Sequence, residues 1–226
     1  MDMNIMTVPG ITNSALTLHA MDVAEERADT LAIIDLENDY VPAAESTDAF
    51  SDRVKTVDAA VQALRDRNLD NNYGCAYYPW VQIYDRINDQ FVWVPPSVAA
   101  LGTMANSQAV SELWFAPAGF NRGGLTDGAA GVPVTGISQR LSSRDRDNLY
   151  DVSINPIASF PAEGIVVFGQ KTLQATPSAL DRINVRRLLI FLKKQVSRLA
   201  TQVLFDQNIE VTWNRFIGLV EPFLRS

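Results

Sequence analysis

The sequence is poor in the side chains that most metal and catalytic sites use. Its 226 residues include one cysteine, Cys75, and one histidine, His19. A single cysteine excludes an intrachain disulfide and fits a reducing compartment. A zinc site of the usual nitrogen and sulfur ligands is not expected from this composition, and any Ser-His-Asp or Cys-His centre would have to use His19. We therefore expect no metal, no cofactor and no catalytic residue.

Both of these residues have simpler structural interpretations. His19 lies in a helix pattern, three residues after Leu16 and four before Val23, so it borders an apolar face. This position predicts a buried or half-buried structural histidine. Cys75 lies between two small residues in a strand pattern, which is typical of a small buried cysteine.

Long apolar runs and excess positive charge are also missing. No run approaches the roughly 18 to 20 residues needed to span a bilayer, and the start of the chain lacks the basic and apolar segments of a secretory signal. The formal net charge of -7 argues against general affinity for nucleic acid, because phosphate binding needs clustered cations in a favourable overall field. The composition predicts a protein made in a cytoplasm, with no direct contact to nucleic acid or membrane.

Strand and helix patterns alternate through the first part of the chain. Apolar runs bounded by turn residues are separated by segments in which apolar residues recur at helical spacing. This alternation predicts a mixed, mainly parallel α/β sheet flanked by helices, and we expect one domain over residues 1–226. The expected elements are a strand at 4–10, a helix at 15–28, a strand at 29–37, a helix at 51–68 and a strand at 73–85.

The rest of the chain gives weaker patterns. Residues 119–148 are rich in Gly, Asp, Arg and Ser, which predicts a long surface loop with little regular structure. The end of the chain predicts long helices with a break near Asp206. Between these regions we expect a strand at 91–97 that ends at its prolines, a short helix at 98–107, a strand followed by a turn at 111–119, and a strand at Gly164–Phe168.

Two carboxylates, Asp35 and Glu37, lie at the carboxyl end of the predicted strand at 29–37. Ligands often bind at the carboxyl ends of parallel strands, so an α/β enzyme with an acidic site at these residues is an open alternative. The sequence offers no partner motif, no phosphate-binding glycine loop and no serine in a nucleophile-elbow pattern. A solvated strand end is therefore the favoured interpretation.

One short stretch of this acidic chain is strongly basic. Residues 186–198 read RRLLIFLKKQVSR, and residues 178–203 carry a net charge of +5, which leaves -12 elsewhere. On a helical wheel, one arc is apolar and predicts the core face: Val185, Leu188, Leu189, Leu192, Val196, Leu199 and Val203. The opposite side holds the basic arc and two bulky apolar side chains: Arg186, Arg187, Lys193, Lys194 and Arg198, with Ile190 and Phe191.

The bulky apolar residues favour a protein partner for the basic side of this helix. Bulky apolar side chains gain nothing from exposure to water, whereas in a protein interface they become buried. Positive and negative faces of one polarised chain can also attract each other between copies. We therefore predict that the seven residues of the basic side form a subunit interface. A solvated helix and a nucleic-acid site remain alternatives, although the aromatic residues that stack on bases are not interleaved here.

Motifs along most of the chain resemble the contractile tail sheath proteins of bacteriophages and related contractile injection particles. Each is weak alone, but YYPW, VPPS, APAG and NVRRLL in this order and spacing are specific. The matching stretches are VPGIT (8–12), EERADTLAIIDLE (25–37), CAYYPWVQIYD (75–85), VPPSVAALGTMA (94–105), WFAPAGFNRG (114–123), INPIASFPAEGIVVFGQKTL (154–173), INVRRLLIFLKKQV (183–196) and LFDQNIEVTWNRF (204–216).

The resemblance implies a mechanical role without an enzymatic step. Sheath subunits stack as sixfold rings or helical strands around an inner tail tube, and their rigid-body rotation contracts the sheath and drives the tube through the bacterial envelope. The implied partners are other sheath subunits, the inner tail tube protein, and the baseplate and tail terminator proteins. The implied location is the virion tail, after assembly in the host bacterial cytoplasm. A bacterial contractile injection system is the alternative source.

Family members are usually longer than this chain. We expect the sequence to hold a truncated conserved core, with the N- and C-terminal arms and the outer insertion domains absent from it. The motif residues Trp80 and Trp93 are expected to anchor the core or a domain edge.

Overall fold

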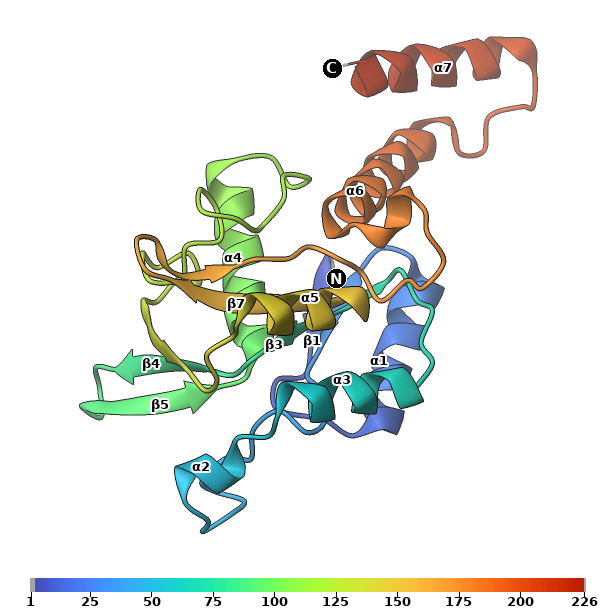
Figure 1. Cartoon of the computed structure of the whole chain (residues 1–226). Coiled ribbons are helices and arrows are strands. Elements are labelled where there is room, and N and C mark those ends of the chain that lie inside the picture. Colours follow the sequence, from blue (N-terminus) through green and yellow to red (C-terminus); the bar gives the residue numbers. More distant parts are fainter. Residues whose placement is uncertain (1–2, 226) are drawn as a thin grey trace.

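The fold is built around a five-stranded sheet of mixed direction, with helices on both faces (Figure 1). The computed structural model describes residues 3–225. The strand order is β1-β2-β3-β7-β8, and every contact is parallel except that of β7 with β8. The predicted mixed, mainly parallel α/β fold is confirmed. The strands are β1 (Ile5–Thr7), β2 (Leu31–Ile34), β3 (Gly74–Tyr78), β7 (Ile154–Phe160) and β8 (Gly164–Val167).

The central strands are buried on both faces, which is why their sequences are continuously apolar. In β2, Ala32 and Ile34 belong to the hydrophobic cluster on one face of the sheet, and Leu31 and Ile33 to the cluster on the other. Successive side chains of a strand point to opposite faces, so one short run supplies both clusters.

Helices cover the two faces in separate layers. One cluster joins the sheet to α1 (Ser14–Arg27), α3 (Val57–Asp66) and α5 (Ser143–Asp151). The other joins it to α4 (Pro96–Val110) and α6 (Ile183–Ala200). The loops between these layers bring the starts of α1 and α4 together at the carboxyl end of β2.

Side chains that cap the helices fix where they begin. The Asn13 side chain accepts hydrogen bonds from the backbone N–H groups of Ala15 and Leu16 at the start of α1. Ser142 and Asp145 form a reciprocal capping box at the start of α5. Such caps satisfy N–H groups that have no partner within the helix.

A second, antiparallel sheet has the order β5-β4-β6. The predicted strand at 73–85 is two strands in different sheets, separated at Pro79, because proline has no N–H for a ladder. The strand predicted at 91–97 ends at Pro95, and the next helix starts at Pro96. The three strands are β4 (Val81–Asp85), β5 (Gln90–Val94) and β6 (Val134–Ile137).

The helix predicted at 51–68 is also divided. A short α2 (Phe50–Arg53) precedes α3, and Thr56 caps α3 by accepting a hydrogen bond from the Ala59 N–H. Trp80 is buried and its ring centroid lies 5.1 Å from that of Tyr40. Trp93 stacks on Phe50 at 5.0 Å, so both tryptophans anchor the segment around α2, as expected.

The prediction of a long surface loop at 119–148 is wrong. This stretch contains β6 and the start of α5, and its first part covers the edge of β8. The Gly119 N–H donates to the Val167 carbonyl at 2.8 Å, and Leu125 is fully buried. A Cβ added at Gly123 would lie 2.9 Å from the Val167 oxygen, so this glycine permits close backbone contact. The strand predicted at 111–119 is wrong too, because these residues form turns.

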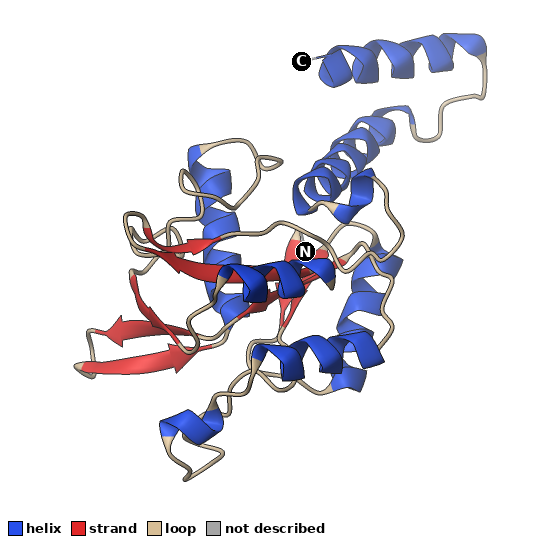
Figure 2. Ribbon diagram, in the orientation of Figure 1, coloured by secondary structure: helices blue, strands red, loops and turns tan. Residues whose placement is uncertain are grey.

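The last helices extend beyond the sheet, as Figure 2 shows. A turn of 3₁₀ helix (Ala179–Asp181) precedes α6, and another (Thr201–Val203) follows it. After the predicted break near Asp206, which is confirmed, α7 (Glu210–Arg225) contains no buried residue. It approaches α6 through Phe223, whose ring centroid lies 6.1 Å from that of Phe191.

Candidate functional site

The basic helix α6 packs on the sheet with the side opposite to the one predicted. Its buried residues are Ile183, Arg186, Arg187 and Ile190, whereas Leu189 is 40% exposed. The predicted core face is wrong, because none of these residues is buried: Val185, Leu188, Leu189, Leu192, Val196, Leu199 and Val203. Long arginine stems can be buried when the surrounding fold supplies contacts for the guanidinium group, which a wheel cannot register.

Arg186 and Arg187 anchor α6 to the rest of the molecule. The Arg186 guanidinium lies 4.0 Å from the Tyr73 ring centroid, and its Nη2 donates to the Asn72 Oδ1 at 2.5 Å. Arg187 is 1% exposed, and its Nη2 donates to the Gln108 Oε1 on α4 at 3.3 Å. Burial lowers the pKa of both guanidinium groups. These two arginines therefore serve internal contacts.

The other residues predicted for the interface lie at or near the surface, except Ile190, which is 2% exposed. Phe191 is half-buried, with its ring centroid 5.2 Å from that of Trp114. Lys193 and Arg198 are exposed, and Lys194 donates to the Met3 carbonyl. The structure thus turns three of the seven predicted residues inward and leaves four where a partner can reach them.

Asp35 is buried and hydrogen-bonded to two other segments of the chain, so its interpretation as a solvated strand end is wrong. It is 1% exposed, and its carboxylate accepts hydrogen bonds from the Gly10 N–H at 2.8 Å, the Ser97 N–H at 3.1 Å and the Ser97 hydroxyl at 2.7 Å. Burial raises the pKa of Asp35, and these hydrogen bonds oppose the rise. Glu37 accepts a hydrogen bond from the Ser14 N–H at 3.0 Å. Both carboxylates hold helix starts in place.

A third carboxylate, Asp39, gave no signal in the sequence. It is 1% exposed, and neither carboxylate oxygen has a hydrogen-bond partner within residues 3–225. Burial first, and then the charge of Asp35, raise the pKa of Asp39 well above its ordinary value, and the nearby Trp80 backbone N–H opposes this rise. A polar loop after a strand predicts exposed side chains, so only the tertiary structure reveals this group.

Cys75 and His19, the single cysteine and the single histidine, both have structural interpretations from the sequence, and only one of these is confirmed. Cys75 is fully buried, as predicted, and burial raises the pKa of its thiol. His19 is exposed, so its predicted burial is wrong. Helix α1 instead buries Thr17, Met21 and Ala24, which lie three or four residues apart on one side of the helix.

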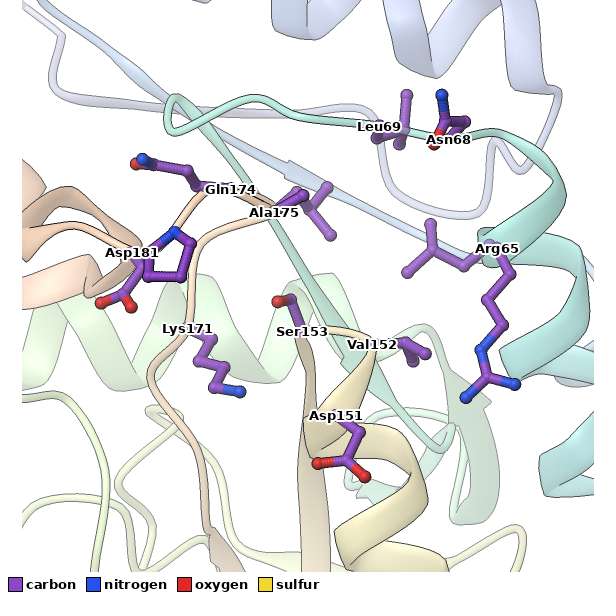
Figure 3. A pocket seen from close by; sticks show the side chains of 13 residues that line it. Arg65, Asn68, Leu69, Asp151, Val152, Ser153, Lys171, Gln174, Ala175 and Asp181 are labelled. Atoms are coloured by element: carbon purple, nitrogen blue, oxygen red, sulfur yellow. The ribbon is translucent and has the colours of Figure 1, made fainter.

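A hollow of about 360 Å³ lies between the end of α3, the start of β7 and residues 171–177 (Figure 3). Arg65 and Lys171 face it together with Asp151 and Asp181, so charges of both signs surround it. The Lys171 ammonium group already donates to the Tyr150 carbonyl at 2.7 Å. Because the charges are mixed and Lys171 already has a backbone partner, we interpret this hollow as a gap between packed elements and do not assign a reaction to it.

Two further searches of the described residues gave negative results. Residues 3–225 contain no group of three or more His, Cys, Asp or Glu side chains placed to hold a metal ion. None of the helices in this part of the chain combines the length and apolar character that crossing a bilayer requires.

Curated proteins similar to this chain are phage tail sheath proteins. That of Enterobacteria phage T4 is 32% identical over 216 residues, which make up 95% of this chain and 32% of that protein. That of Vibrio phage KVP40 is 37% identical over 166 residues, 73% of this chain and 24% of that protein. The chain belongs to the tail sheath protein family. It spans about a quarter to a third of the length of these sheath relatives. No protein-family model matches the chain.

Solved sheath structures have the same fold. The contracted helical sheath of the anti-feeding prophage matches with a TM-score of 0.68 and 20% identity, over 98% of this chain and 53% of that chain. The contracted PVC sheath complex, from an extracellular contractile injection system, matches with a TM-score of 0.61 and 20% identity, over 86% of this chain and 47% of that chain. At these identities the likeness establishes the fold, and the sequence relatives establish the family.

Proposed function

We propose that the chain is the core of a contractile tail sheath subunit, a structural protein that polymerises around the inner tube of a phage tail and contracts by subunit rotation. The similarity to the T4 tail sheath protein over 95% of this chain carries the proposal. A sheath of a bacterial contractile injection system is the second candidate, favoured by the fold of the anti-feeding prophage sheath. Either role is mechanical, and the structural role of the relatives points away from catalysis.

The proposed partners are other copies of the subunit, the tube, the baseplate and the tail terminator. The proposed location is the virion tail, after assembly in the host bacterial cytoplasm. A sheath that moves as rigid bodies needs subunits that keep their shape while contacts between them change. The two hydrophobic clusters that enclose the central sheet suit this requirement.

The outward side of α6 is the surface that we propose for contact with a neighbouring copy. It presents the cations of Lys193 and Arg198 beside the exposed Leu189. Helix α1 presents a complementary surface, with Leu16 58% and Leu18 43% exposed near three exposed carboxylates: Asp22, Glu25 and Glu26. Exposed charge pairs contribute only about 0–1 kcal/mol each, so many copies can exchange them at low cost. The tube is the alternative partner for α6.

Electron microscopy of the complete gene product that carries this sequence tests the proposed function. We expect striated tubular polymers at high protein concentration. Compact, discrete particles under all assembly conditions would contradict a sheath role.

The double variant Lys193→Glu, Arg198→Glu tests the proposed surface. We expect weaker polymer formation, measured by sedimentation, while the protein stays folded, because both side chains are exposed. Arg144→Glu is the matched control, since it reverses an exposed charge on α5. Unchanged polymer formation by the double variant would remove this surface from the interface.

A further inference from the structure

A two-stranded ladder closes the base of the segment that carries α2. This segment, residues 38–55, leaves the body after β2 and returns before α3, and Figure 1 shows α2 standing away from the sheet. Tyr40 pairs with Val54 in an antiparallel bridge. The Lys55 N–H donates to the Asp39 carbonyl at 2.8 Å, so Asp39 and Lys55 are directly opposite each other at the body end of the ladder.

This position places two opposite charges on one face of the ladder. Directly opposite residues of an antiparallel pair have their Cβ atoms about 4.5–5.5 Å apart and on the same side. Asp39 and Lys55 also line the same hollow of about 120 Å³, beside Tyr40 and Trp80. The lysine side chain therefore begins beside the hollow that the carboxylate also lines.

In the structure these two groups do not meet. The Lys55 ammonium group donates to the Asp52 carbonyl at 2.9 Å, and Lys55 is exposed. The Asp39 carboxylate is buried without a well-aligned hydrogen bond among residues 3–225, and the nearby Trp80 backbone N–H only partly offsets the cost of its burial. An isolated buried carboxylate is strongly disfavoured unless it takes up a proton or a cationic partner.

We infer that Asp39 and Lys55 form a proton-controlled latch at the base of the α2 segment. While Asp39 carries its proton, Lys55 rests on the Asp52 carbonyl. When the Asp39 proton leaves to solvent, the Lys55 ammonium group turns into the hollow and pairs with the new carboxylate. This inference goes beyond the proposed sheath function and does not depend on it.

The other charged groups around Asp39 do not offer the same pairing. The negative charge of Asp35 opposes the loss of the Asp39 proton, and Glu45, another carboxylate, lines the same hollow. Arg53 holds the Tyr40 hydroxyl at 2.8 Å, with its guanidinium over the Tyr40 ring. The phenol of Tyr78 donates to the Gln139 side chain, and its pKa is raised by burial and by Asp39. Lys55 is therefore the cation that the ladder places beside Asp39.

Hydrogen exchange of the Lys55 backbone amide tests the latch, because this N–H donates to the backbone carbonyl of Asp39 and is protected only while the ladder is closed. Opening the ladder returns Asp39 to water and to its ordinary pKa, so ionisation favours the open form. Above about pH 4 we expect the protection factor to fall roughly tenfold per pH unit and then to level off where Lys55 pairs with the carboxylate.

Three variants separate the parts of this inference. Lys55→Met keeps the side-chain stem without the charge, so the fall in protection should continue about one pH unit or more beyond the wild-type plateau. Asp39→Asn should remove the fall, and Asp48→Asn, at an exposed site in the same segment, should keep it. Wild-type protection as flat as that of Asp39→Asn would overturn the titration, and the same plateau in Lys55→Met would overturn the role of Lys55.

Discussion

At the scale of single residues, buried polar groups join segments that are far apart in the sequence. Asp35 connects the start of α1 to the start of α4 through Gly10 and Ser97. Arg187 connects α6 to Gln108 of α4 in the same way. Each of these groups is stable inside the protein only because its partners are held in place by the surrounding fold.

Replacing Asp35 by Ala tests this role. The Ser97 N–H and the Ser97 hydroxyl would lose their acceptor in a buried place, and the Gly10 N–H would lose its acceptor near the surface. We expect the free energy of unfolding at pH 7 to fall by about 2–4 kcal/mol, since each buried group left without a partner costs about 1–3 kcal/mol. Urea unfolding measures this, with Asp48→Ala as the exposed control; a loss under about 1 kcal/mol would contradict the role.

At the scale of elements, the orientation of α6 matters most. Both sides of this helix are rich in apolar residues, and the side that packs on the sheet carries Ile183 and Ile190 together with two arginines. The side with more leucines is half-buried, apart from Leu189, which is 40% exposed.

Two substitutions in neighbouring positions distinguish the two sides of α6. Ile190→Ala creates a cavity beneath the helix and should cost about 2–4 kcal/mol of unfolding free energy. Leu189→Ala removes a side chain that is 40% exposed and should cost less than about 1 kcal/mol. Chemical denaturation measures the free energy of unfolding of both variants. A larger loss for Leu189→Ala than for Ile190→Ala would mean that the leucine-rich side of α6 is the buried one, as the helical wheel predicted.

At the scale of the whole molecule, the stable unit is the five-stranded sheet with its two helix layers. The two hydrophobic clusters draw on α1, α3, α4, α5 and α6, but neither includes a residue of α7. Helix α7 lies outside this unit and presents Val211, Trp213 and Ile217, each more than half exposed.

Removing α7 should therefore leave the core folded. We expect a chain that ends at Val203 to unfold within about 2–4 °C of the longer chain, which corresponds to a change of about 1 kcal/mol for a protein of this size. A chain that ends at Ser178 is the contrasting control, because it also loses the buried Ile183, Arg187 and Ile190. Calorimetry measures both, and a drop above about 10 °C on loss of α7 alone would place α7 in the folding unit.

The sequence by itself determined the local elements and the family. The apolar run of β2, the small buried Cys75 of β3 and the cap at Asn13 act within a few residues, so periodicity and capping rules predict them well. The ordered motifs also sufficed to indicate a tail sheath relative.

Only the tertiary structure decided which side of each helix is buried and which polar groups lie inside. Arg187 lies inside, where Gln108 accepts one of its N–H groups; Asp35 lies inside, where Ser97 donates to it; and the glycine-rich stretch pairs with β8. These partners are distant in sequence, so no local pattern carries the information. The burial of a polar side chain is a property of the partners that the fold brings to it.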